Sequence, residues 1–407
     1  MQKMLRNNTD QVLFKKILQN ELGHQNFIIK QVKQDPLSSK AEHGLSDICR
    51  IHIRYIEDGE ENDKNGNLLS LIVKKEPNTE GAGLDLIRKQ GLFPTEIKFL
   101  WDVLPQLEER LGFRMGPKIF YSNENSDLII MEDLGAKGYR LPDRQKGLSM
   151  QYALMAIDRL AKFHAASVSL FEDKPELIKQ FKIGIMSRET HENMYKIVES
   201  TLSLLANSII EKWIDQEAVT AAHKLLKMTE NFENRIAKVY DYDDNEEFCV
   251  LNHGDCWHSN LLFKTNERGT LLDMLMIDYQ MTIFTSPAID LLYFLGICPA
   301  IDIKCEMDDY FLEVYLQTLK MTMGRICCKT EAPTMDQLKK AIYKRNIYAV
   351  FSSLIFYPRM IADEIDTETF DDILATGETK MDVFKNPDAI AAVGKIIKVL
   401  NQRGYLD

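Results

Sequence analysis

The sequence predicts an α+β protein of two lobes: a small β-rich lobe over residues 1–134 and a larger, mainly helical lobe over residues 135–407. A chain of 407 residues is longer than one compact core usually requires, so two units are expected. Apolar residues recur with period two in the first third of the chain and with period three to four over most of the remainder. Hydrophobic residues make up 45% and charged residues 27%, as in a folded globular protein.

The first expected elements form a hairpin. In residues 46–56 the apolar side chains of Ile51, Ile53 and Tyr55 alternate with polar ones, which is the pattern of a half-buried strand. Residues 57–67 read as a polar turn rich in glycine and asparagine, and residues 68–74 as the returning strand.

A helix and two short strands are expected to complete the small lobe. Apolar residues in 94–111 recur at helical spacing, and Pro105 should kink or divide this helix. Residues 118–122 and 127–131 read as strands. The loop after Leu134 is rich in glycine, so the boundary between the lobes is placed there.

The larger lobe should be helical with one β-rich insert. The pattern predicts helices over 150–168, 176–237, 308–319 and 336–362, and a buried helix over Ala288–Ile303. The insert comprises strands at 247–251 and 274–277. His164 lies on the apolar face of the first of these helices, where a hydrogen-bonded core histidine is expected. This order of elements is typical of kinase-like phosphotransferases.

Charge and cysteine usage exclude some function classes. The formal net charge is −11, so the chain lacks the overall electrostatics of a protein that binds nucleic acid or anionic membranes, although a local basic patch stays open as an alternative. No apolar stretch is long enough for a membrane span. The seven cysteines are scattered without a CxxC motif, so we expect reduced thiols and a cytoplasmic location.

One segment carries the chemistry. The strand at 247–251 runs into Asn-His-Gly-Asp-Cys-Trp-His-Ser-Asn at 252–260, and an Ile-Asp-Tyr-Gln segment contains Asp278. Phosphoryl transfer needs a carboxylate to accept the hydroxyl proton, and an amide oxygen with a second carboxylate to hold Mg²⁺. Asp255, Asn260 and Asp278 supply this set, and a hairpin would bring Asp278 back beside the loop.

Other interpretations of these residues stay open. Such a motif also occurs by chance. His253, Asp255 and His258 have a spacing that suits the ligands of a hydrolytic metal site, although such a site needs further ligands. Lys74 follows apolar residues and shares a face with Ser70 and Ile72, an awkward position for a charge unless an anion meets it. Lys75 is the alternative for that role.

The sequence resembles the ecdysteroid kinase-like family, which is related to choline and aminoglycoside kinases. The resemblance is carried by HGDCWHSN at 253–260 with IDYQ at 277–280, where the tryptophan and the glutamine are distinctive. Further similar segments are LIVKKEP, EIKFLWDVLPQLEE, MEDLG, LAKFHAAS and SPAIDLL, and the match runs over nearly the whole chain.

The resemblance implies an ATP- and Mg²⁺-dependent enzyme that phosphorylates a hydroxyl of a small molecule, such as an ecdysteroid or another steroid-like alcohol. It assigns Asp255 as the catalytic base, and Asn260 and Asp278 as Mg²⁺ ligands. It assigns Lys74 as the contact to the ATP phosphates and Glu96 as the acid paired with that lysine. The backbone of 131–134, including Glu132 and Leu134, is assigned as the adenine-binding connector, Ser46 as a nucleotide contact and Asp290 as a brace of the catalytic loop. For Glu96, a role as a helix N-terminal carboxylate is the alternative. The segment 42–47, where the phosphate-covering turn is expected, keeps only Gly44 of the expected glycines, which puts the Ser46 contact in question.

The acceptor pocket is expected between residues 136 and 240, which contain Tyr139, Phe171, Met186, Tyr195 and Trp213. Such residues at helical spacing are also ordinary core. The alternative to a kinase is a catalytically silent, kinase-like protein that binds a small molecule.

Overall fold

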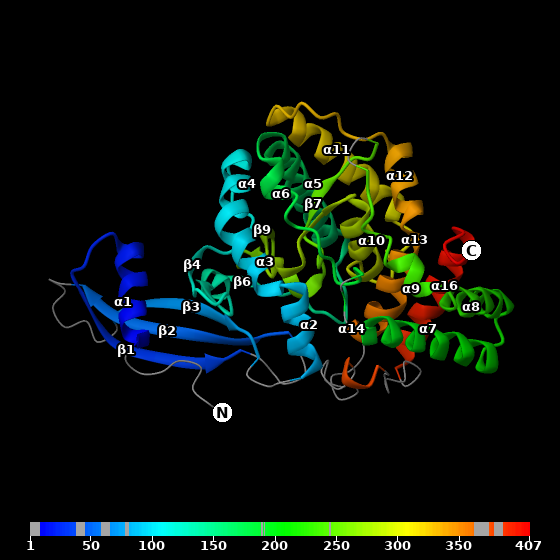
Figure 1. Ribbon diagram of the computed structural model, residues 1–407, viewed down its shortest axis with the longest axis horizontal. Helices are drawn as coiled ribbons and strands as arrows, with labels where there is room; N and C mark the ends of the chain where they lie inside the picture. The colour runs from blue at the N-terminus through cyan, green and yellow to red at the C-terminus, as the bar shows by residue number, and fades with distance from the viewer. Residues whose placement is uncertain are drawn as a thin grey trace.

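The computed structural model describes residues 9–37, 45–57, 66–77, 81–188, 190, 192–243, 246–361, 374–377 and 386–407. Figure 1 shows an antiparallel sheet at one end of the molecule and helices gathered at the other. Glu42 to Gly44 of the expected phosphate-covering turn, residues 58–65 of the expected hairpin turn and Ala362 at the end of the last expected helix lie outside the described residues.

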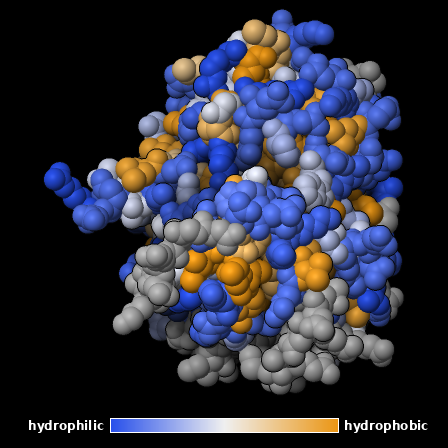
Figure 2. Space-filling model, turned by 90° about the vertical axis from the view of Figure 1, so that its left-hand side faces the viewer, coloured by the Kyte–Doolittle hydropathy of each residue, from blue (hydrophilic) through white to orange (hydrophobic). Residues whose placement is uncertain are grey.

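The N-terminal sheet has five strands in the order β1-β2-β3-β5-β4. All its pairs are antiparallel. Its strands are β1 (Phe27–Pro36), β2 (Asp47–Glu57), β3 (Asn67–Lys75), β4 (Ile119–Ser122) and β5 (Leu128–Glu132). The predicted hairpin is β2–β3, in which Ile48 pairs with Lys74. Figure 2, which views the molecule from this end, shows apolar and hydrophilic side chains intermixed on its surface.

The two faces of this sheet have different neighbours. Helix α1 (Thr9–Leu22) packs its buried Phe14, Ile17 and Leu18 with the face that carries Ile51, Ile53, Leu71 and Val73. Lys74 has the opposite parity to Val73 and therefore points to the other face, toward the helical lobe. Neither α1 nor β1 is among the expected elements.

The helix predicted over 94–111 is divided into segments. It comprises α3 (Leu92–Lys98), the π-helical η1 (Phe99–Val103) and α4 (Leu104–Leu111), and α2 (Ala82–Gln90) precedes it. Pro105 lies in the first turn of α4 and follows η1 directly, so it stands inside a continuous helical segment, where it has no N–H to donate and its ring crowds the preceding turn. The irregular turn therefore precedes the proline.

The remainder is mainly helical, as predicted. Its helices are α5 (Met150–Asp173), α6 (Pro175–Ile178), α7 (Glu192–Lys212), α8 (Gln216–Thr229), α9 (Phe232–Ile236), α10 (Ala288–Ile297), α11 (Asp308–Arg325), α12 (Met335–Lys344), α13 (Asn346–Phe351), the π-helical η5 (Ser352–Phe356), α14 (Tyr357–Ile361) and α16 (Pro387–Gln402). The buried helix predicted over 288–303 ends at Ile297, shortly before Pro299. None of the helices in the described ranges is long and apolar enough to cross a membrane.

The β-rich insert has more strands than the sequence predicts. β7 (Val250–Asn252) pairs with β10 (Ile283–Thr285), and β6 (Tyr139–Arg140), β8 (Leu261–Thr265) and β9 (Leu271–Met276) form a second sheet. Three short 3₁₀ helices accompany them: η2 (Leu134–Lys137), η3 (His258–Asn260) and η4 (Tyr279–Met281). The loop from β7 to η3 and the turn from β9 to η4 carry the chemical residues.

Candidate active site

The loop that carries Asp255 begins with a sharp turn at Gly254. Its φ is +80°, and a Cβ placed there would lie 1.9 Å from the carbonyl oxygen of Met281. No other residue fits this position without moving the backbone. The turn presses the loop against the segment that joins β9 to β10.

Asp255 is held on both carboxylate oxygens. Asn260 Nδ2 donates to Asp255 Oδ2 at 2.8 Å and to the Asp255 backbone oxygen at 2.9 Å. Tyr293 Oη donates to Asp255 Oδ1 at 2.9 Å. Burial, assisted by the nearby charge of Asp278, raises the pKa of Asp255 to about 7. A carboxyl with such a pKa is suited to accept a proton near neutral pH.

The β8–β9 hairpin brings Asp278 to this loop. Leu261 pairs with Met276, and Ile277 N donates to the backbone oxygen of Asn260 at 3.0 Å. Asp278 follows with a φ of +66°, a left-handed conformation that is uncommon for residues other than glycine. Such strain clusters at functional sites. The structure therefore places Asp278 beside Asn260, as the spacing in the sequence predicts.

Lys74 joins the small lobe to this turn. Its Nζ donates to Glu96 Oε2 at 2.6 Å, to Asp278 Oδ1 at 2.7 Å and to Gln280 Oε1 at 3.1 Å. Lys74 is 3% exposed. Burial by itself would lower the pKa of this amine, but Asp278 and Glu96 outweigh it and raise the pKa, so the lysine stays charged. Lys75 is half-buried on the opposite face of β3.

Asp290 is buried behind the loop. Its carboxylate accepts from the backbone N–H groups of His253 at 2.6 Å and Gly254 at 2.9 Å. It also lies 3.0 Å from Nε2 of His164, whose Nδ1 lies 2.8 Å from Tyr315 Oη. His164 is fully buried and hydrogen-bonded, as expected for a core histidine. The contacts of Asp290 agree with a brace for the loop backbone.

The geometry disfavours the hydrolytic metal site. Both ring nitrogens of His253 are engaged, since Nδ1 accepts from Asp255 N at 3.3 Å and Nε2 lies 3.0 Å from the carbonyl oxygen of Ile277. Within the described ranges, no cluster of three or more His, Cys, Asp or Glu side chains could hold a metal ion. His253 and His258 therefore lack the partners that such a site requires.

Hard oxygen donors for Mg²⁺ are nevertheless present. The amide nitrogen of Asn260 is committed to Asp255, which leaves Asn260 Oδ1 without a hydrogen-bond donor among the described residues. The Asp278 side chain is 27% exposed. An amide oxygen and a carboxylate at one position suit a hard cation, so these two residues fit the ion that the resemblance implies.

The connector between the lobes is tied to the sheet. The Glu132 carboxylate accepts from Arg114, from Lys137 Nζ at 2.6 Å and from Lys118 N at 3.1 Å. The backbone N–H of Glu132 donates to Lys118 O at 2.9 Å. The backbone N–H and the carboxylate of Glu132 are therefore engaged within the protein. The backbone carbonyl oxygen of Glu132 is its remaining polar group that could accept a hydrogen bond from a nucleotide.

Other expected nucleotide contacts have weaker structural support. Leu134 is buried and opens η2. Ser46 is buried just before β2. In the described part of the chain, no hydrogen bond joins Ser46 to Lys74, Asp255 or Asp278.

The residues expected to line an acceptor pocket are largely engaged within the helical lobe. Met186 and Tyr195 are buried, the ring of Phe171 stacks on that of Phe284 at 4.6 Å, and Tyr139 Oη donates to Asp273 at 2.6 Å. These contacts favour the core interpretation for these four residues.

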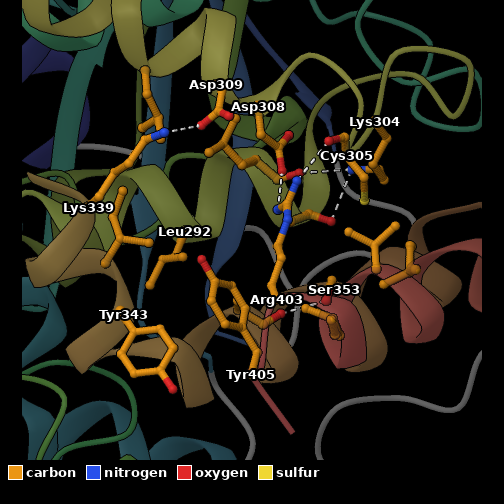
Figure 3. Close-up of a pocket in the computed structure, with 18 of the residues that line it drawn as sticks. Leu292, Lys304, Cys305, Asp308, Asp309, Lys339, Tyr343, Ser353, Arg403 and Tyr405 are labelled. Carbon is orange, nitrogen blue, oxygen red and sulfur yellow. Dashed lines mark hydrogen bonds and ion pairs between the residues drawn. The ribbon is translucent and has the colours of Figure 1, made fainter. Parts of the chain in front are cut away.

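A separate pocket of about 580 Å³ lies on the side of α10 that carries Leu292, Leu295 and Gly296 (Figure 3). Residues of α10, α11, α12 and α16 line it, and Asp255, Asp278 and Lys74 do not. In its wall, Lys304 Nζ donates to the carbonyls of Leu295 at 3.1 Å and Gly296 at 3.0 Å, near the C-terminal end of α10. This pocket opens on the surface of the helical lobe at Asp309, Lys339 and Tyr343, and it is separate from the site that holds Asp255.

Comparison with known proteins agrees with the architecture. The sequence model of the ecdysteroid kinase-like family matches residues 40–328. No curated protein matches the chain. One similar solved structure is the ternary complex of streptomycin, ATP and APH(2")-IIa, with 15% identity, coverage of 96% of this chain and 99% of that chain, and a TM-score of 0.40, which is too low to support an argument. The family match covers well over half of the chain and agrees with the predicted α+β bilobal, kinase-like fold: the chain belongs to the ecdysteroid kinase-like family.

Proposed function

We propose that the protein is an ATP- and Mg²⁺-dependent kinase that transfers the γ-phosphoryl group to a hydroxyl of a small molecule. The observation that carries the proposal is the arrangement around Lys74 and Asp255. One buried amine binds both Glu96 and Asp278, and a hairpin contact links Asp278 to the loop in which Asn260 binds Asp255. These are the groups that phosphoryl transfer requires.

Asp255 is the proposed general base. Its carboxylate takes the proton of the acceptor hydroxyl while that oxygen bonds to the γ-phosphorus, and the bond to the ADP oxygen breaks. Its pKa of about 7 supports this role because a near-neutral base is partly ionised at physiological pH and still holds a proton well.

Lys74 is the proposed phosphate contact, oriented by Glu96. Asn260 and Asp278 would hold Mg²⁺, which, when bound, neutralises charge on the phosphate oxygens. The connector at 131–134 is the proposed adenine-binding segment, with Ser46 as a further contact. The scattered cysteines support a reducing, cytoplasmic location.

The acceptor is proposed to be an apolar, steroid-like alcohol. The family name points to ecdysteroids. Near Asp255, the ring of Phe356 lies 6.5 Å from that of Trp257, and both side chains are partly exposed. Such an aromatic surface beside the base suits an apolar molecule that presents one hydroxyl.

Two measurements test the proposal. Calorimetry should detect ATP binding that depends on Mg²⁺, and ATP consumption should rise when hydroxylated steroids are added. Binding of Mg-ATP without consumption in the presence of any alcohol would indicate the silent binding protein instead. Thermal stabilisation by Zn²⁺ but not by Mg-ATP would contradict both and favour a metallohydrolase.

A further inference from the structure

We infer that Tyr293 is a positioning residue, whose hydroxyl fixes the carboxylate of Asp255 for proton transfer. The inference rests on the proposed function, because it concerns the same base. Tyr293 belongs to α10 and is three residues beyond Asp290, so the two side chains share one face of the helix. The neighbouring Leu292 faces the pocket on the other side (Figure 3).

The hydrogen bonds define the orientation of the base. Tyr293 Oη donates to Asp255 Oδ1 at 2.9 Å, and Asn260 Nδ2 donates to Oδ2 at 2.8 Å. A carboxylate with one donor on each oxygen cannot rotate about its χ2 angle without breaking both bonds. Each oxygen keeps a further lone pair, so the group is fixed but still able to accept a proton.

The packing around the ring of Tyr293 holds its hydroxyl at Asp255. Tyr293 is 3% exposed, and its ring packs 5.7 Å from that of Phe356 and 6.1 Å from that of Tyr348. Burial, together with the charge of Asp255, raises the pKa of the phenol well above its ordinary value, so the hydroxyl keeps its proton and remains a donor.

Helix α10 is also anchored to the loop. Asp290 binds the backbone N–H groups of His253 and Gly254, immediately before Asp255. The helix therefore holds two consecutive backbone groups and the reacting side chain. Asp290 fixes where the loop lies, and Tyr293 fixes how the carboxylate points.

The matched variants are Tyr293→Phe, which removes only the hydroxyl, and Tyr348→Phe, which removes a buried phenol hydroxyl that does not contact Asp255. With 20-hydroxyecdysone and Mg-ATP as substrates, Tyr293→Phe should lower kcat by about 10–100-fold, as for a misplaced base, and leave KM for ATP within about threefold. Tyr348→Phe should keep kcat within about threefold. A Tyr293→Phe kcat equal to that of the wild type would overturn the inference.

A double-mutant cycle separates positioning from a structural effect. In the Asp255→Asn background, Tyr293→Phe should change the residual kcat by less than about threefold, because residues that act as a unit are non-additive. A full additional loss in that background would show that Tyr293 acts elsewhere and would refute the inference.

A crystal structure of Tyr293→Phe tests the same contact without turnover. It should show the Asp255 carboxylate rotated or in two conformers, and an unchanged carboxylate would contradict the inference. If wild-type protein phosphorylates no alcohol, the proposed function fails, whereas this structure still decides whether Tyr293 orients Asp255.

Discussion

Asp255→Asn should make the metal-free protein more stable at pH 8 while it removes activity. Burial and Asp278 raise the pKa of Asp255 from 3.8 to about 7 in the folded protein. A carboxyl with a raised pKa binds its proton more tightly when folded, so its ionisation opposes folding. This cost is absent below pH 3.8, grows as the pH rises toward 7 and is complete above it.

The magnitude follows from the difference in pKa. A difference of about three pKa units corresponds to at most about 4 kcal/mol in the free energy of unfolding. Because Asp255 is partly accessible and can relax with its surroundings, we expect about 1–3 kcal/mol from its replacement by a neutral amide. The new amide can still accept from Asn260 through its oxygen and donate to the hydroxyl of Tyr293 through its nitrogen, so both contacts survive.

The assay is thermal unfolding in EDTA at several pH values. At about 2–4 °C per kcal/mol, the variant should melt several degrees above the wild type at pH 8, and the advantage should shrink toward pH 5. Asp85→Asn, at an exposed position in the first turn of α2, should be neutral or slightly destabilising. A variant that is less stable at pH 8, or equally more stable at every pH, would refute this account of the buried carboxyl.

Three further predictions concern the same site. Lys74→Met should lower kcat/KM for ATP by a factor that corresponds to about 2–4 kcal/mol of transition-state stabilisation. Lys75→Met, on the other face of β3, should change kcat/KM for ATP less than about threefold. A loss of activity in Lys75→Met but not in Lys74→Met would argue against the role of Lys74. Asp278→Ala should abolish Mg²⁺-dependent ATP binding, because it removes the carboxylate ligand, and calorimetry that shows unchanged affinity would count against it. Gly254→Ala should unfold or distort the loop, since its Cβ would lie 1.9 Å from Met281 O; a wild-type melting temperature together with full activity is the contrary result.

Local patterns predict much of this fold. The alternation in residues 46–56 gives the correct buried face of β2, with Ile51 and Ile53 in the core. The same parity places Lys74 toward the helical lobe, where it contacts Glu96 and Asp278. The spacing of Asp255, Asn260 and Asp278 predicts their proximity because one hairpin joins them.

Features that depend on tertiary contacts were not predicted. β8 is missed because the segment 261–265 has only five residues, the last two of which are polar, so only pairing with β9 defines the strand. Tyr293 is also missed: in the sequence it is one of two aromatic residues in a helix that is apolar except for Asp290. Its spacing of three residues from Asp290 is the signal that could have found it. The engaged N–H and carboxylate of Glu132 depend on Lys118 and Arg114, which no local pattern links to it.

The most direct test of the central claim is the detection of a phosphorylated alcohol. Wild-type protein and Asp255→Asn are incubated with γ-labelled ATP, Mg²⁺ and a panel of hydroxylated steroids, and the products are separated and identified by mass spectrometry. The account predicts a labelled phosphate ester that forms only with Mg²⁺ and falls about 10²–10⁴-fold in Asp255→Asn, while both proteins bind Mg-ATP with similar affinity. Equal amounts of labelled ester from the two proteins, or Mg-ATP binding with no labelled alcohol from either, would contradict it.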